Sequence, residues 1–209
     1  FLKIGMKAAI EATRPGVKET DILAEAEYAM RKAGSEGSPF RMQVLRHDRQ
    51  QLIHPYAGDY VINDNEPVVI HLGASYKGYV AKMCRTVFLG DVNEETKAIY
   101  DLLKETQQVA IDAISPGVKA GEVYDKAFKV VHDQGYAKMF LPTIGYGVGI
   151  RQSEFYPIIS KGSEHVLEEN MIVDLLLPTI YQPKTGGPRI TDTILIKNGR
   201  CINLTGSQL

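Results

Sequence analysis

The chain repeats its own pattern once, and this repeat limits the folds it can adopt more than any other feature. Residues 12–37 read ATRPGVKETDILAEAEYAMRKAGSEG, and residues 113–138 read AISPGVKAGEVYDKAFKVVHDQGYAK. In both copies Pro-Gly closes one helix, and a polar stretch opens a second, amphipathic helix that ends at Gly34 or Gly135. Because Pro-Gly-Val-Lys recurs in register with the whole helical pattern, we interpret the copies as an internal duplication.

Two β segments bounded by turn residues follow each helix pair. They are residues 66–79 and 80–90 in the first half, and 169–181 and 189–199 in the second. The sequence therefore predicts an α+β chain of two α-α-β-β halves, about 1–100 and 101–209, within one domain over residues 1–209. The simplest arrangement joins the two sheets side by side with all helices behind them. A ligand is then expected on the helix-free face, where the halves meet.

The charge balance and the cysteine content exclude several classes of partner and site. Lys+Arg 24 against Asp+Glu 25 leaves a net charge of −1, so neither nucleic acid nor an anionic membrane is an expected partner. Cys84 and Cys201 are the only cysteines, which predicts neither a disulfide framework nor a structural zinc site and favours a cytoplasmic setting. Apolar runs such as residues 172–177 fall far short of the ~20 residues that span a bilayer.

Three motifs occur in order around the repeat. Residues 71–86, HLGASYKGYVAKMCRT, resemble the pattern D-L-G-A-x-Y-x-G-Y-x-x-D-x-x-R-T. Residues 145–150, GYGVGI, resemble G-H-G-I-G-L, and residues 187–193, GPRITDT, resemble G-V-R-I-E-D-T. On these motifs the chain resembles the creatinase, prolidase and methionine aminopeptidase superfamily over nearly its whole length. The resemblance implies the pita-bread fold, in which two pseudo-repeats form one curved antiparallel sheet backed by helices.

The resemblance also implies a pair of divalent metals that activate a bridging water, held by two aspartates, a histidine and two glutamates. At those positions this chain has His71, Lys82, Tyr146, Thr191 and either Leu176 or Leu177. Lys82 would place a positive charge where the family has a cation. We therefore expect a member of the superfamily that lacks the metal ligands, with no metal and no other cofactor.

A histidine on the loop before the first motif contacts the substrate in this superfamily, and His54 resembles it. Creatinase works without metal and uses this histidine as acid and base, a role that suits an imidazole near neutral pH. The resemblance thus implies a metal-independent, creatinase-like hydrolase or lyase that acts on a C–N bond. We expect four catalytic residues: His54, Lys82, Tyr146 and Glu154. Creatine itself is not expected, because Cys84 and a leucine replace the glutamates that hold its guanidinium.

Four further residues are expected to bind the substrate: His71, Thr191, Arg189 and Tyr79. Four carboxylates of the family site have become one lysine and neutral groups, so the pocket should prefer a small anionic molecule. This preference requires that the Lys82 ammonium has no acidic neighbour; the alternative is a lysine that extends to solvent. Cys84 is expected to point away from the neighbours of Lys82.

A non-catalytic module that binds a peptide or protein partner, as some superfamily members do, remains the alternative to an enzyme. The resemblance further implies a homodimer. Because the chain starts at Phe1 inside a predicted helix, we also expect an N-terminal domain of the parent protein to precede it.

Overall fold

A computed structural model describes residues 1–209 apart from 53, 178–179 and 207–209. The first half contains α1 (Leu2–Ala12), α2 (Glu19–Lys32), β1 (Gln43–Leu45), the short 3-10 helix η1 (His47–Arg49), β2 (Pro67–Tyr76) and β3 (Tyr79–Phe88). The second half contains α3 (Glu94–Ala113), α4 (Ala120–Asp133), the 3-10 helix η2 (Ala137–Met139), β4 (Thr143–Gly147), β5 (Ile158–Ser160), β6 (Ile172–Leu177), β7 (Ile190–Leu195) and β8 (Ile202–Asn203). None of the described helices is long and apolar enough to cross a membrane.

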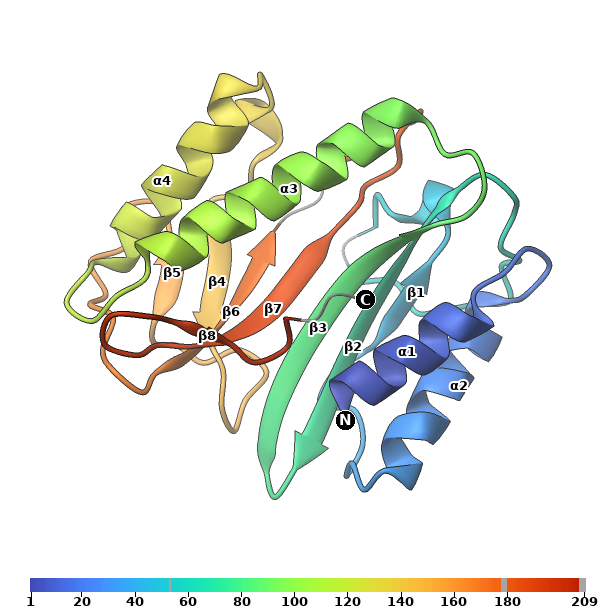
Figure 1. The fold of residues 1–209 in the computed structure, drawn as a ribbon, viewed down its shortest axis with the longest axis horizontal. Coiled ribbons are helices and arrows are strands. Elements are labelled where there is room, and N and C mark those ends of the chain that lie inside the picture. The colour runs from blue at the N-terminus through green and yellow to red at the C-terminus, as the bar shows by residue number, and fades with distance from the viewer. Residues whose placement is uncertain (53, 178–179, 207–209) are drawn as a thin grey trace.

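The strands of the described chain form one antiparallel sheet in the order β1-β2-β3-β7-β6-β4-β5, with β8 paired to β7. Figure 1 shows α1 and α2 beside the strands of the first half, and α3 running across those of the second. The two halves therefore meet where β3 lies beside β7, which confirms the α+β fold with one sheet backed by helices.

The two copies of the sequence repeat adopt matching local structures. Gly16 and Gly117 of the two Pro-Gly turns have φ angles of 86° and 90°, a region that glycine enters without steric cost. Equivalent antiparallel bridges follow these turns, from Lys18 to Val61 and from Lys119 to Val166. The duplication inferred from the sequence is thus present in the backbone, including the connections between each helix pair and its strands.

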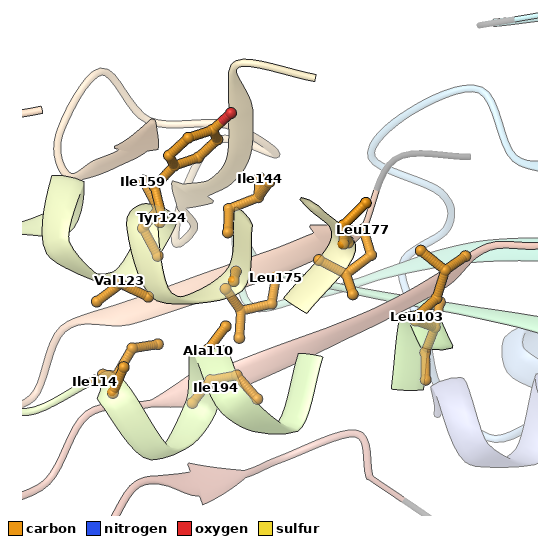
Figure 2. Close-up of a cluster of buried hydrophobic side chains, with 14 of the residues drawn as sticks. Leu103, Ala110, Ile114, Val123, Tyr124, Ile144, Ile159, Leu175, Leu177 and Ile194 are labelled. Atoms are coloured by element: carbon orange, nitrogen blue, oxygen red, sulfur yellow. The ribbon is translucent and has the colours of Figure 1, made fainter. Parts of the chain in front are cut away.

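Two hydrophobic clusters fill the space between the helices and the sheet. In the first half, Met6, Ile22, Ile70 and Met83 are fully buried together. Figure 2 shows the cluster of the second half, where side chains of α3 and α4 meet those of the sheet; it includes Leu103, Val123, Leu175, Leu177 and Ile194. Each half thus buries one face of its strands against its own helices.

Hydrogen bonds of side chains connect β3 to β7 at the junction of the halves. Cys84 and Thr191 are the only residues of the two described strands that pair directly in the sheet. Two residues away, the backbone N–H of Lys82 donates to Oγ1 of Thr193 at 3.1 Å, and this hydroxyl lies 2.9 Å from the Lys82 carbonyl oxygen. The threonine thus takes the place of a backbone partner for Lys82.

The same arrangement occurs on the other side of the Cys84–Thr191 pair. The backbone N–H of Arg189 donates to Oγ1 of Thr86 at 2.9 Å, and this hydroxyl donates to the Arg189 carbonyl at 3.0 Å. The junction therefore has approximate twofold symmetry, with one threonine hydroxyl from each half bridging to the opposite strand.

Candidate functional site

Alternation along the strands decides which side chains face away from the helices. In β2 and β3, Ile70, Leu72 and Met83 pack under the helices, so His71 and Lys82 point to the other face. The helix-side core takes four side chains from β6 and β7: Leu175, Leu177, Ile190 and Ile194. The helix-free face of the junction is therefore made by His71, Lys82, Asp174, Leu176, Thr191 and Thr193.

Lys82 and Asp174 form a buried ion pair on this face. Nζ of Lys82 lies 2.5 Å from Oδ2 of Asp174, and the two residues are only 4% and 0% exposed. Oδ1 of Asp174 lies 3.0 Å from the Thr193 hydroxyl, which has one proton to share between this oxygen and the Lys82 carbonyl. One compact network thus links β3, β6 and β7.

Asp174 was not predicted as part of the site, and its presence corrects the treatment of Lys82 as an ammonium without an acidic neighbour. Burial raises the pKa of the Asp174 carboxyl to about 6, although Lys82 and Thr193 act in the opposite direction. The signal was present in the sequence. An aspartate inside the apolar strand 172–177 would be costly to bury without a partner of opposite charge.

Tyr146 and Leu176 complete this region. Tyr146 of β4 is the direct cross-strand partner of Asp174 and therefore lies on the same face of the sheet, half-buried. Leu176 pairs with Thr191, whereas Leu177 packs in the helix-side core. The sequence left open whether Leu176 or Leu177 replaces the metal-binding glutamate. Leu176 is the one that faces the site.

His71 lies beside Lys82 and is surrounded by positive groups. Burial, followed by the nearby charges of Lys82, Arg189 and His54, lowers the pKa of His71 to about 3. Its ring packs against Phe40 with centroids 4.9 Å apart, and Nε2 is buried without a hydrogen-bond partner among the described residues. His71 is therefore a neutral imidazole at physiological pH.

Arg189 connects the junction to the loop before β2. Its guanidinium donates to Oε1 of Gln43 at 3.2 Å, to the carbonyl of Leu52 at 2.8 Å and to the carbonyl of Gln50. Burial lowers the pKa of Arg189. Because these partners are neutral oxygens, the hydrogen bonds fix the loop without neutralising the charge of the arginine.

Among the described contacts, the other expected catalytic residues form no hydrogen bond or ion pair with Lys82 or Asp174. His54 is exposed, and its carbonyl accepts a hydrogen bond from Nη1 of Arg41 at 2.7 Å; its link to the site is its electrostatic effect on His71. Glu154 lies in the loop after β4, where Oε1 accepts from the backbone N–H of Arg151 at 2.9 Å. The Glu154 carboxylate thus binds a backbone group of its own loop and not Lys82.

Tyr79 is not brought to the candidate site. It lies at the β2–β3 turn, 64% exposed, and alternation along β3 puts it on the opposite face from Lys82. There it lines a groove of about 610 Å³ together with Phe1 and Tyr76.

Cys84, by contrast, shares a face with Lys82, because residues two apart on a strand point the same way. The expectation that it points away was wrong. Cys84 packs with Leu45 and Val69, and burial raises the pKa of its thiol to about 12. It is therefore a protonated, hydrophobic component of the site and not a nucleophile.

The sequence matches metallopeptidase family M24 over residues 2–198. The chain belongs to this family. It is 39% identical over 193 residues to an Xaa-Pro dipeptidase of Pyrococcus horikoshii, covering 92% of this chain and 54% of that protein. It is 37% identical over 201 residues to an Xaa-Pro dipeptidase of Pyrococcus furiosus, covering 96% and 57%.

Solved structures agree with this assignment. The prolidase of P. horikoshii superimposes with a TM-score of 0.92 at 36% identity, covering 98% of this chain and 58% of that one. An X-Pro aminopeptidase of Thermotoga maritima gives 0.91 at 30% identity, covering 99% and 59%. The pita-bread fold is thereby confirmed, and the chain spans little more than half the length of these relatives.

These relatives correct the expected function. The prediction of a metal-independent, creatinase-like hydrolase or lyase acting on a C–N bond of a small anionic metabolite is contradicted, because the relatives are dipeptidases named for Xaa-Pro peptides. The alternative of a non-catalytic module is not favoured either, since prolidases are among the similar structures.

The metal pair of the superfamily does not fit the residues that this chain offers. Where two carboxylates would bind cations stand the neutral His71 and the ammonium of Lys82, and the latter already engages Asp174 at 2.5 Å. Among the described residues, no group of three or more His, Cys, Asp or Glu side chains is placed to hold a metal ion.

Proposed function

We propose that the protein is a hydrolase of the Xaa-Pro dipeptidase type, with short peptides that carry proline after the scissile bond as its substrate class. The observation that carries this proposal is the 39% identity to the P. horikoshii Xaa-Pro dipeptidase over 92% of the chain. The backbone supports it, because the prolidase of that organism superimposes with a TM-score of 0.92. Fold alone would be weaker support, since one fold can host many activities.

The charges at the junction suit a dipeptide. Lys82 is matched by Asp174, whereas Arg189 is held by neutral oxygens and adds one uncompensated positive charge beside His71. A free dipeptide ends in a carboxylate, which such a site attracts. The expected preference for an anionic ligand is thus retained as a proposal, with Arg189 in place of Lys82 as the source of the charge.

The proton-handling groups that this chain can contribute are Asp174 and Tyr146. A carboxyl whose pKa is raised to about 6 can hold or release a proton close to neutral pH. Tyr146 lies directly across from it and is more exposed, so its hydroxyl is better placed to donate a hydrogen bond to a peptide carbonyl. We propose that these two residues, and not Glu154, serve the reaction.

The test is proline release from Xaa-Pro dipeptides by the purified protein, with the matched Xaa-Ala dipeptides as controls. We expect proline release to exceed alanine release by at least about 10-fold. Parallel reactions contain either a chelator or added Mn²⁺. Absence of proline release under both conditions would show that the proposed activity is wrong. Release that is insensitive to the chelator would make the protein a metal-independent member of the family.

A further inference from the structure

We infer that the Lys82–Asp174 ion pair takes the place of the metal pair of the family at the sheet junction, with the Lys82 ammonium as its cationic member, and that this chain does not take up the two cations. This inference concerns the occupancy of the site and goes beyond the proposed substrate class.

Lys82 stands at one of the family's metal-binding positions. The resemblance places two metal-binding carboxylates at residues 71 and 82, and in the structure these residues lie on adjacent strands. The register pairs His71 with Cys84 and Gly73 with Lys82. The side chains of His71 and Lys82 therefore project from the same face of the sheet, diagonally opposite each other. The Lys82 ammonium therefore lies where a cation would be held.

The carboxylate of Asp174 is already engaged by groups of this chain. Asp174 is fully buried, with one oxygen 2.5 Å from Nζ of Lys82 and the other 3.0 Å from the Thr193 hydroxyl. A divalent cation would have to displace the ammonium from this carboxylate and then remain beside a second positive charge. Asp174 thus compensates Lys82 and is not a surviving metal ligand.

The other residues at the family's ligand positions do not suit a divalent cation. Tyr146, Leu176 and Thr191 offer a phenol, an alkyl group and a hydroxyl where the family has an imidazole and two carboxylates. Hard divalent cations need several charged oxygen or imidazole ligands. One lysine and one aspartate form a neutral pair by themselves, so the junction needs no bound cation for charge balance.

Direct metal analysis tests the inference. The protein is incubated with excess Mn²⁺ or Co²⁺, desalted and analysed for metal, and its melting temperature is measured with and without EDTA. We expect less than about 0.1 equivalent of metal per chain and a melting temperature changed by less than roughly 1 °C. One or two equivalents of retained metal, lost together with stability on chelation, would overturn the inference.

Substitution tests whether the ion pair supports the fold. Removing one partner of a buried pair leaves the other charge uncompensated, so Lys82→Met should lower the melting temperature by roughly 6–20 °C. The matched control is Lys119→Met, because Lys119 forms an exposed pair with Glu164 at 2.6 Å and its loss should have little effect.

A double variant keeps this test decisive if Lys82→Met does not fold. Replacing both partners, as Lys82→Met with Asp174→Leu, removes both charges and should recover most of the lost melting temperature. A double variant that is no more stable than Lys82→Met, or a Lys82→Met protein as stable as wild type, would overturn the structural role of the pair. Metal content is measured without substrate, so failure here is distinct from failure of the proposed hydrolysis.

Discussion

The ammonium of Lys82 lies 2.5 Å from the carboxylate of Asp174, and the two residues come from different halves of the duplicated chain. The pair lies on one face of the sheet beside the junction of β3 and β7. On the opposite face, Nη2 of Arg85 donates to Oδ1 of Asp192 at 2.7 Å. Two ion pairs on opposite faces, one buried and one largely buried, thus hold the halves together where the sheet has few direct backbone contacts.

The twofold symmetry of the junction predicts that two substitutions, one in each half, both destabilise the fold. Thr193→Val and Thr86→Val each remove a hydroxyl that bridges to backbone groups of the opposite strand. Each should lower the free energy of unfolding by about 1–3 kcal/mol, because buried backbone groups lose their partner. Urea denaturation measures both values. A negligible loss for either threonine would contradict the symmetric role.

His71 should make the protein sensitive to mild acid. Its pKa is lowered from 6.5 to about 3 in the folded protein, so the unfolded chain takes up a proton as the pH falls below 6.5 while the folded chain does not. Stability is therefore lost as the pH falls through this window.

Between pH 7 and pH 5 this difference amounts to about 2 kcal/mol. Wild type should lose that much more stability than His71→Gln, measured by chemical denaturation at the two pH values. Equal losses in the two proteins would show that the His71 imidazole is protonated as readily in the folded state as in the unfolded one.

Cys84 should not react with thiol reagents in the folded protein. It is 1% exposed and the pKa of its thiol is raised to about 12 by burial, so almost no thiolate is present at pH 8. Ellman's reagent should detect at most Cys201 before unfolding and both cysteines afterwards. The variant Cys201→Ser isolates Cys84, and rapid labelling of that variant would contradict the burial of this residue.

The homodimer implied by the superfamily resemblance stays a prediction. Light scattering on the eluting peak of a size-exclusion column should give twice the 23.2 kDa chain mass at micromolar concentration. A monomer mass at all concentrations tested would make the prediction wrong for this chain.

The fold could be predicted because its signals are local and repeated. The two Pro-Gly turns, the glycines Gly34 and Gly135 just after α2 and α4, and the motif around residues 71–86 each fix a short segment. The duplication supplies each helix signal twice. The order of the elements in each half follows from these segments without any knowledge of distant contacts.

The site was harder to predict because its decisive contact is not local. Asp174 belongs to none of the motifs, and only the placement of β6 beyond β7 brings it to Lys82. The orientation of Cys84 follows from strand alternation, because residues 82 and 84 are two apart on β3 and share a face. The choice between Leu176 and Leu177 needed the register between β6 and β7, which sequence alone does not provide.

The central claim is that an internal ion pair stands in place of the metal pair, and diffraction at the manganese absorption edge from crystals grown in Mn²⁺ tests it most directly. The account predicts no anomalous peak beside residues 71 and 82, with Nζ of Lys82 within about 3 Å of the Asp174 carboxylate. A strong anomalous peak between these strands, with the Lys82 side chain displaced from Asp174, would contradict it.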